Sequence, residues 1–163
     1  MSLLDQFKDA LGSWASGVTV VTTRVDDLLY GLTVSSFGSV SLHPPLVSVC
    51  INNGNRAAGM IERSHWFAVS LLGAGHAGAS DYFARSGREP TEGFVEIDGE
   101  LTDSGLPIVR GAMAYVVCDV VTAVPAGDHT LFVGRVTSAG SDPTQSPLVY
   151  WRRRYRSLVE PGP

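Results

Sequence analysis

The sequence has little charge and only short apolar runs, and each shortage excludes a class of protein. Of its 163 residues, 17% are charged and 44% are hydrophobic, a balance that excludes an intrinsically disordered chain. The apolar runs are as short as Phe67-Ala68-Val69 and Val116-Val117-Cys118, so no segment is predicted to span a bilayer. The net charge of −4 disfavours a nucleic-acid binder, because such proteins gain affinity by neutralising phosphates.

Cysteine and recognisable catalytic motifs are also scarce. The two cysteines, Cys50 and Cys118, lie in apolar stretches, so we expect two reduced, buried thiols and no disulfide. The four histidines lack metal-ligand spacing, and no metal site is predicted. The chain contains no G-x-S-x-G, H-E-x-x-H or Walker pattern. Residues 1–14 carry charged side chains where a signal peptide needs an apolar run, so a cytoplasmic protein is expected.

The patterning that is present predicts one mainly β domain over residues 1–163. Alternating Val, Thr and Ser with many turn residues indicate strands, and the short connections favour antiparallel pairing. We expect an α+β fold, a barrel or sandwich with short helices at the connections. The expected strands are 18–23, 28–34, 46–51, 66–72, 94–101, 112–124, 129–138 and an edge strand at 147–154; the expected helices are 3–14, a short one from the 52–55 turn through Arg63, and 75–85.

One glycine motif suggests a different fold. Residues 73–78 match G-x-G-x-x-G after a strand, and Glu96 and Asp98 follow about twenty residues later, where a dinucleotide fold places its ribose ligand. That fold requires a parallel βαβ unit, whereas the flanking segments here are typical of an antiparallel meander. A loop of small residues is therefore favoured.

Hydroxyl side chains crowd residues 31–41, which run off the end of an expected strand. Such a segment is either an ordinary polar loop or a set of amides and hydroxyls that hydrogen-bond the edge of a flat heterocycle. Composition alone leaves both open.

Several separate motifs, in order, resemble the flavin reductase family. They are SGVTVVTT at 16–23, YGLTVSSF at 30–37, SVSL at 39–42 with PPLV at 44–47, FAVSLL at 67–72, FA at 83–84, GDH and LFVGRV within 127–136, and PLVY at 147–150 with Tyr155. The resemblance covers roughly residues 7–158. These are small flavin-binding proteins that supply reduced flavin to two-component monooxygenases, so the resemblance implies an antiparallel FMN-binding split β-barrel.

The resemblance also implies a flavin site. Its cofactor-binding residues are Thr33, Val34, Ser35 and Ser36 at a strand end, Ser48, Val49, Cys50, Ile51 and Asn52 on a neighbouring strand, Asn53, Asn55 and Arg56 at a helix entry, and Phe83. A helix N-terminus suits the flavin phosphate because its amides are free and its dipole end is positive. Arg56 is alternatively a solvated first-turn arginine, and Phe83 alternatively a core aromatic.

His129 is the catalytic candidate that the resemblance implies, near the nicotinamide and the flavin. Beside Asp128 it could donate a hydrogen bond to the nicotinamide carboxamide or to the anionic reduced ring; the alternative is an exposed turn residue. Tyr150 and Tyr155 would help to close the pocket or the dimer interface. The run 152–154 of arginines is favoured as a solvated tail over a clamp for an NADPH 2′-phosphate.

The implied activity is an NAD(P)H:flavin oxidoreductase that passes hydride to FMN or FAD and hands reduced flavin to a partner monooxygenase. The family forms homodimers, and no nucleic acid or membrane partner is expected. Gly38 and the 52–55 turn depart from the family pattern, which leaves FMN and FAD both open. The alternatives are a non-catalytic flavin carrier on the same barrel and a pyridoxamine-phosphate-oxidase-like enzyme, which would need more basic residues at the phosphate than Arg56.

Overall fold

The structure, a computed structural model, describes residues 1–91 and 99–158 and is built on one large antiparallel sheet. Seven strands follow the order β3-β2-β6-β9-β10-β5-β4, with smaller β1-β11-β12 and β7-β8 sheets beside them. The strands are β1 Ser16–Gly17, β2 Thr19–Val25, β3 Leu28–Val34, β4 Gly38–Leu42, β5 Pro45–Asn52, β6 Trp66–Leu71, β7 Gly99–Leu101, β8 Pro107–Val109, β9 Ala114–Ala126, β10 His129–Ser141, β11 Val149–Trp151 and β12 Arg154–Arg156. The expectation of a mostly antiparallel β protein with short helices is confirmed.

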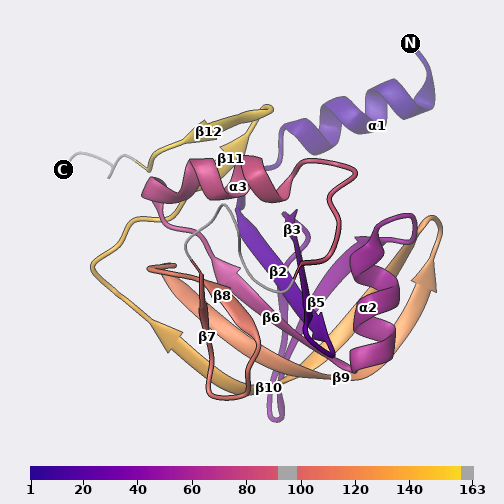
Figure 1. Cartoon of the computed structure of the whole chain (residues 1–163). Coiled ribbons are helices and arrows are strands. Elements are labelled where there is room, and N and C mark those ends of the chain that lie inside the picture. The colour runs from indigo at the N-terminus through magenta and orange to yellow at the C-terminus, as the bar shows by residue number, and fades with distance from the viewer. Residues whose placement is uncertain (92–98, 159–163) are drawn as a thin grey trace.

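Four short helical segments lie beside the sheet in the described part of the chain. They are α1 Leu3–Gly12, α2 Arg56–Ser64, the 3-10 turn η1 Ala74–His76 and α3 Ala77–Phe83. Figure 1 shows α2 beside the curled sheet, α3 across its upper end below the β11–β12 hairpin, and α1 projecting from the body. None of the helices in the described ranges is long and apolar enough to cross a membrane.

The main core lies between the sheet and α2. Phe67 and Phe132 are fully buried at its centre, and α2 adds a buried face of small and aliphatic side chains. Gly134 is required there, because a Cβ would lie 2.6 Å from the Phe67 ring and 2.7 Å from the Cβ of Cys118. The β strands that the sequence predicts therefore pack at interior density.

A second core cluster lies under α3 and positions the candidate site. Phe83 is buried and packs on β3, where a Cβ on Gly31 would lie 2.9 Å from its ring. The glycine thus lets α3 approach the strand closely. The far end of β3 is joined to β5 by Ser36, whose Oγ donates to the Cys50 carbonyl at 3.1 Å and accepts from the Cys50 amide at 2.9 Å.

Several sequence predictions need correction or fall outside the described residues. The edge strand predicted at 147–154 is wrong: the chain forms a hairpin of β11 and β12, because residues 152 and 153 make a tight turn. β4 lies in the segment predicted as a Ser-rich loop. The strand predicted at 94–101 is seen only from Gly99, because 94–98 lie outside the described residues. The glycine motif 73–78 forms η1 and the start of α3 after β6, which pairs antiparallel on both sides.

Candidate functional site

Two cavities lie along β3, one at its carboxyl end and one beside Tyr30. The first, here called the hairpin cavity, has a volume of about 420 Å³, within the range of small-molecule sites. It lies between the carboxyl end of β3, one face of α3 and the β11–β12 hairpin. Its lining side chains include Thr33, Ser35, Ser80, Asp81, Tyr150, Arg153, Arg154 and Tyr155.

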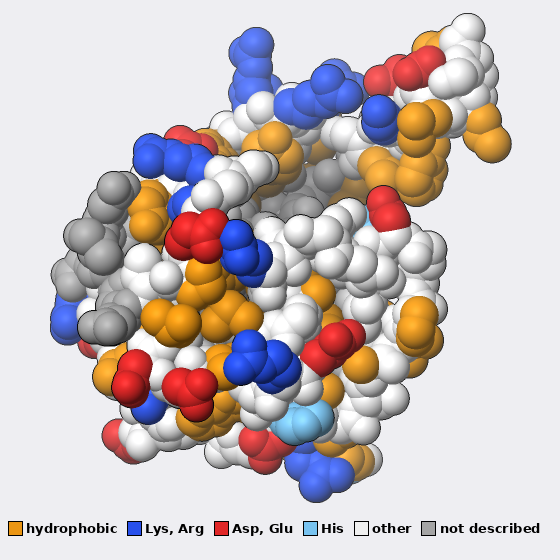
Figure 2. All heavy atoms as spheres, turned by 45° about the vertical axis from the view of Figure 1, so that its right-hand side comes forward, with side chains coloured by type: hydrophobic (Ala, Val, Ile, Leu, Met, Phe, Trp, Pro, Cys, Tyr) orange, Lys and Arg blue, Asp and Glu red, His pale blue; other side chains and the backbone are white. Residues whose placement is uncertain are grey.

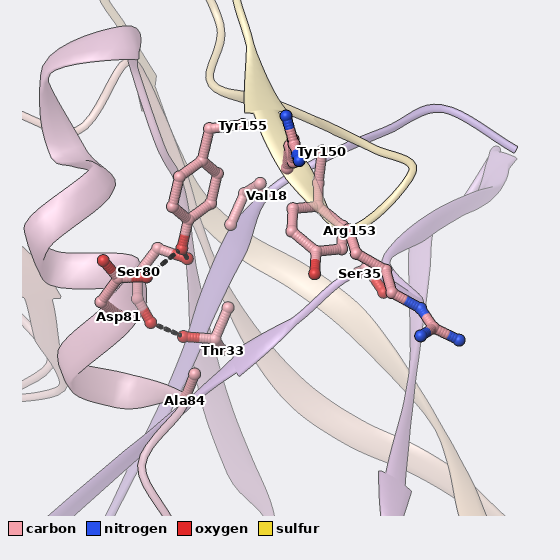
Figure 3. A pocket seen from close by; sticks show the side chains of 10 residues that line it. Val18, Thr33, Ser35, Ser80, Asp81, Ala84, Tyr150, Arg153 and Tyr155 are labelled. Atoms are coloured by element: carbon pink, nitrogen blue, oxygen red, sulfur yellow. Dashed lines mark hydrogen bonds between the residues drawn. The ribbon is translucent and has the colours of Figure 1, made fainter. Parts of the chain in front are cut away.

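One wall of the hairpin cavity is tied together by hydrogen bonds. Thr33 Oγ1 donates to the Ser80 carbonyl at 2.7 Å, which anchors β3 to α3. Tyr155 Oη lies 2.6 Å from Asp81 Oδ1 and 2.8 Å from Ser80 Oγ, so the hairpin is anchored to the same helix (Figure 3). Burial first, and the bond to the Asp81 carboxylate second, raise the pKa of Tyr155. The phenol therefore stays protonated and donates to the carboxylate.

The other wall of the hairpin cavity carries an exposed ring and positive charge. Tyr150 packs edge-on against Tyr155, with ring centroids 5.7 Å apart. Figure 3 shows Tyr150 and Arg153 across the cavity from Ser80 and Asp81. An aromatic ring beside guanidinium groups suits a ligand that is both flat and anionic.

The second cavity, here called the helix cavity, lies at the N-terminus of α2 and has a volume of about 370 Å³. Asn55 caps α2 by accepting from the Ala57 amide at 2.9 Å, and Asn52 Oδ1 accepts from the Gly54 amide at 2.9 Å. The structure thus gathers two of the three predicted phosphate residues, Asn55 and Arg56, around one cavity, together with Asn52, which was predicted to line the ring. The remaining lining residues are Tyr30, Gly54, Ser86, Gly87 and Arg88.

Both arginines of the helix cavity have partners within the protein. Arg56 Nη2 lies 2.5 Å from Glu89 Oε1 in an exposed ion pair. Arg88 donates to the carbonyls of Gly31 and Phe83, and its guanidinium lies 5.0–5.2 Å from three ring centroids. Sequence reasoning missed Arg88, because nothing near it in the chain distinguishes it from a surface arginine.

The remaining predicted residues lie at the junction of β3, β5 and β10. His129 pairs with Asn52, and Leu131 pairs with Cys50, whose backbone holds Ser36. Asn53 Oδ1 accepts from the Thr130 hydroxyl at 2.8 Å. The structure therefore brings the β3 end, the β5 segment and His129 into one region.

Some predicted residues present no side chain to either cavity. Val34, Val49 and Ile51 are buried, so only their backbones could reach a ligand, while Ser48 is half-buried. Phe83 is 2% exposed and occupies the core position that the sequence left open.

The two thiols differ. Cys50 is half-buried and free, and Cys118 is free and fully buried; burial first, and the charge of Asp119 second, raise the pKa of Cys118 to about 12.

His129 lines neither cavity but is held in place. Its Nδ1 lies 2.6 Å from Asp128 Oδ1, and its side chain is 41% exposed. The hydrogen bond to His129 first, and the charge of the imidazole second, lower the pKa of Asp128. The carboxylate orients the ring and leaves Nε2 free to meet a ligand.

Comparison with known proteins identifies the family of this fold. The flavin reductase like domain matches residues 11–159. The reductase component of 4-hydroxyphenylacetate 3-monooxygenase from Thermus thermophilus is 38% identical over 97% of this chain and 99% of its own. An NADH-dependent flavin reductase from a Rhodococcus species is 39% identical over 93% of this chain and 84% of its own.

Solved structures agree. The NADH:FAD oxidoreductase SgcE6 of Streptomyces globisporus, solved with NAD and FAD fragments, superposes with a TM-score of 0.90 at 32% identity, covering 97% of this chain and 94% of that one. The styrene monooxygenase flavin reductase of Pseudomonas putida S12 gives 0.85 at 33% identity, covering 95% and 98%. Matches of this extent, over nearly the whole chain, establish that the protein belongs to the flavin reductase family of oxidoreductases.

Proposed function

We propose that this chain is an NAD(P)H:flavin oxidoreductase that reduces FMN or FAD and supplies the reduced flavin to a partner monooxygenase. The observation that carries the proposal is the pair of cavities, one between the β3 end, α3 and the β11–β12 hairpin, and one at the N-terminus of α2. Relatives over the whole chain are NADH-dependent flavin reductases and reductase components of monooxygenases, which supports the same assignment.

The chain's own residues fit a flavin. The β3 end and β5 present backbone amides and the side chains of Ser35 and Ser48, which suit the polar edge and ribityl chain of the flavin, while Ser36 holds the two strands together through Cys50. Cys50, with its half-buried thiol, and the backbones of Val34, Val49 and Ile51 would line the ring from below. Thr33 acts indirectly, since its hydroxyl already holds Ser80.

The helix cavity suits the flavin phosphate. The N-terminus of α2 has a positive dipole end, and Arg56 and Arg88 supply two formal charges beside Asn52, Asn53 and Asn55. Two arginines also remove the shortage of basic residues that weighed against a phosphate-binding oxidase. Turnover of NADH, with no release of peroxide from an amine substrate, separates the two functions.

The reaction requires little acid–base catalysis from the protein. The flavin and the nicotinamide, when bound, supply the redox chemistry, in which a hydride leaves the nicotinamide and a proton comes from solvent. The chain must hold the two rings together and exclude water. We assign to His129 a hydrogen bond from Nε2 to the nicotinamide carboxamide or to the reduced ring, with Asp128 orienting the imidazole.

Replacing His129 tests that role. In His129→Ala, flavin reduction in a single turnover should slow about tenfold, while the flavin Kd changes less than twofold. Stopped-flow absorbance at 450 nm and a flavin titration measure the two quantities. Unchanged single-turnover rates would remove His129 from the mechanism.

The chain also presents a surface that fits a second copy of itself. α1 has no buried residue, and its apolar side chains are exposed, as Figure 2 shows by the orange side chains along the projecting helix. The side chains are those of Leu3, Leu4, Phe7 and Leu11 in α1, and Trp14 just beyond its end is also exposed. An isolated helix of ten residues is marginal in water, so the apolar face needs cover. We propose a homodimer in which α1 of each copy packs on the other copy. Light scattering tests this proposal: wild type should be dimeric and Phe7→Asp should be monomeric. A monomeric wild type would contradict it.

The function as a whole is tested by the loss of NADH and NADPH absorbance at 340 nm with FMN, FAD or no added flavin. Fast oxidation that requires added flavin is the expected result. The combination of nicotinamide nucleotide and flavin that reacts fastest then identifies both substrates. A yellow protein without turnover would instead indicate a flavin carrier.

A further inference from the structure

The turn of the β11–β12 hairpin has an unusual backbone. Its two central residues, Arg152 and Arg153, both adopt positive φ angles, of 49° and 60°. Two-residue hairpin turns of this kind favour Gly, which has no Cβ, and Asn, whose short polar side chain tolerates the left-handed region, whereas most other residues are strained there. Strained backbone persists where the surrounding structure enforces it, and it clusters at ligand sites.

Contacts on both sides hold this strained turn in place. The Trp151 indole donates to the Ser13 carbonyl at 3.1 Å, and the Arg152 amide donates to the Gly12 carbonyl at 3.1 Å. On the other side, Tyr155 is bonded to α3 through Asp81. The turn is therefore part of a fixed hairpin where the sequence favoured a solvated tail, although residues 152–154 are exposed.

The three arginines of the hairpin differ in what they face. Arg152 stacks on Trp151, 4.6 Å from the ring centroid, and faces the far side of the hairpin beside α1. Arg154 lines the hairpin cavity, and Arg153 lies between that cavity and the hollow beside α1 that also contains Lys8 and Asp9. Within residues 1–91 and 99–158, neither the Arg153 nor the Arg154 guanidinium has a hydrogen-bond or ion-pair partner.

Neither guanidinium forms an ion pair with the carboxylate that lines the cavity. That carboxylate, Asp81, accepts from Tyr155 on the opposite wall (Figure 3). Two unpaired guanidinium groups beside a cavity form a site for a dianionic group, since each can bind phosphate oxygens in a bidentate manner. The exposed ring of Tyr150 gives the same ligand a flat surface to stack on.

We propose that Arg153 and Arg154 bind the diphosphate of a dinucleotide in the hairpin cavity. The inference rests on the proposed function, in which NAD(P)H and FAD are the two dinucleotides present. Both carry the same diphosphate, whereas FMN and reduced nicotinamide mononucleotide carry none. The chain thus separates the flavin 5′-phosphate, at the helix cavity, from the diphosphate of NAD(P)H, at the hairpin. A diphosphate of FAD at the hairpin would require its flavin phosphate to leave the helix cavity.

The test compares each dinucleotide substrate with the corresponding mononucleotide in the variant Arg153→Gly/Arg154→Gln. Glycine suits the positive φ, so the fold is retained, which a melting temperature no lower than that of wild type checks. With FMN as acceptor, we expect the KM for NADH to rise about tenfold and that for reduced nicotinamide mononucleotide to change less than twofold. If FAD is the source of the diphosphate, its KM rises relative to that of FMN while the KM for NADH stays constant.

The matched control is Arg152→Gly, which relaxes the same turn without touching the hairpin cavity and should leave every KM unchanged. Unchanged KM values for both NADH and FAD in the double variant would overturn the proposal, as would equal losses with the mononucleotides. Calorimetric titration with NAD⁺ and with FAD needs no turnover. It therefore tests the arginines even if the wild type proves inactive and the proposed function fails.

Discussion

Each of the two cavities is lined by two arginines, but the arginines of the two cavities differ in whether they have partners within the protein. In the helix cavity, Arg56 is paired with Glu89, and Arg88 is fixed by backbone carbonyls and aromatic rings. In the hairpin cavity, Arg153 and Arg154 have no such partners in the described part of the chain. An arginine held by backbone carbonyls and rings, such as Arg88, should contribute mainly to stability. An arginine that is exposed or unpartnered should contribute mainly to ligand binding.

Arg88 gives the largest expected effect. Arg88→Ala removes charge-assisted bonds to two carbonyls and the stacking on three rings, so the free energy of unfolding should fall by about 2–3 kcal/mol. Urea denaturation measures it. Arg154→Gln, which loses no internal contact, should change it by less than about 0.5 kcal/mol. Equal losses of unfolding free energy in the two variants would show that the two arginines do not differ in their contribution to stability.

Arg56 should contribute to binding more than to stability. Arg56→Ala leaves its exposed ion pair unformed, which costs little stability, but should weaken FMN about tenfold. Riboflavin, which has no phosphate, should bind to the variant as to wild type. Fluorescence titration of both ligands measures the difference, and equal losses would show that Arg56 does not contact the phosphate.

Glu89 should act in the opposite direction. Its carboxylate occupies the Arg56 guanidinium at 2.5 Å and so competes with an incoming phosphate. We expect Glu89→Gln to tighten FMN about threefold without changing riboflavin, because an exposed pair of this kind is weak. Glu62→Gln, also on the surface near α2, is the matched control. Weaker FMN binding in Glu89→Gln would mean that Glu89 positions Arg56 for the ligand.

Tyr155 should give the smallest effect, seen in the pH dependence of stability. Because its pKa is raised in the folded state, the unfolded chain loses the phenol proton first as the pH rises above 10. The stability that Tyr155 contributes is therefore complete below pH 10 and lost as the pH rises through the folded pKa. In urea titrations at pH 8 and 10.5, wild type should lose more stability than Tyr155→Phe; parallel losses would contradict this.

Local pattern predicted much of the fold. Strand-like runs around a turn predicted the hairpin of β2 and β3, and the 52–55 turn, as a helix cap, predicted α2. The β11–β12 hairpin was missed because its turn contains two arginines and none of the usual turn residues. β4 was missed because its serines resemble a loop and its pairing depends on β5.

The candidate site also contains some residues that local pattern brings together and others that only tertiary packing brings together. Asn52, Asn55 and Arg56 are neighbours in the chain, and so their grouping at a helix entry follows from local structure. Arg88 reaches the same cavity by bonding Gly31, 57 positions away, which no local pattern contains. The placement of Arg153 beside Ser35 likewise depends on the packing of the hairpin on α3.

The sequence by itself determined most of the long strands, the turn that opens α2 and membership of the flavin reductase family, because these depend on side-chain alternation and on motifs that neighbouring residues carry. Only the tertiary structure decided which arginines are neutralised and which are free. That outcome depends on partners far away in the chain, since Glu89 meets Arg56 across 33 positions. Charge pairing is a property of distance in space, and only the folded chain sets that distance.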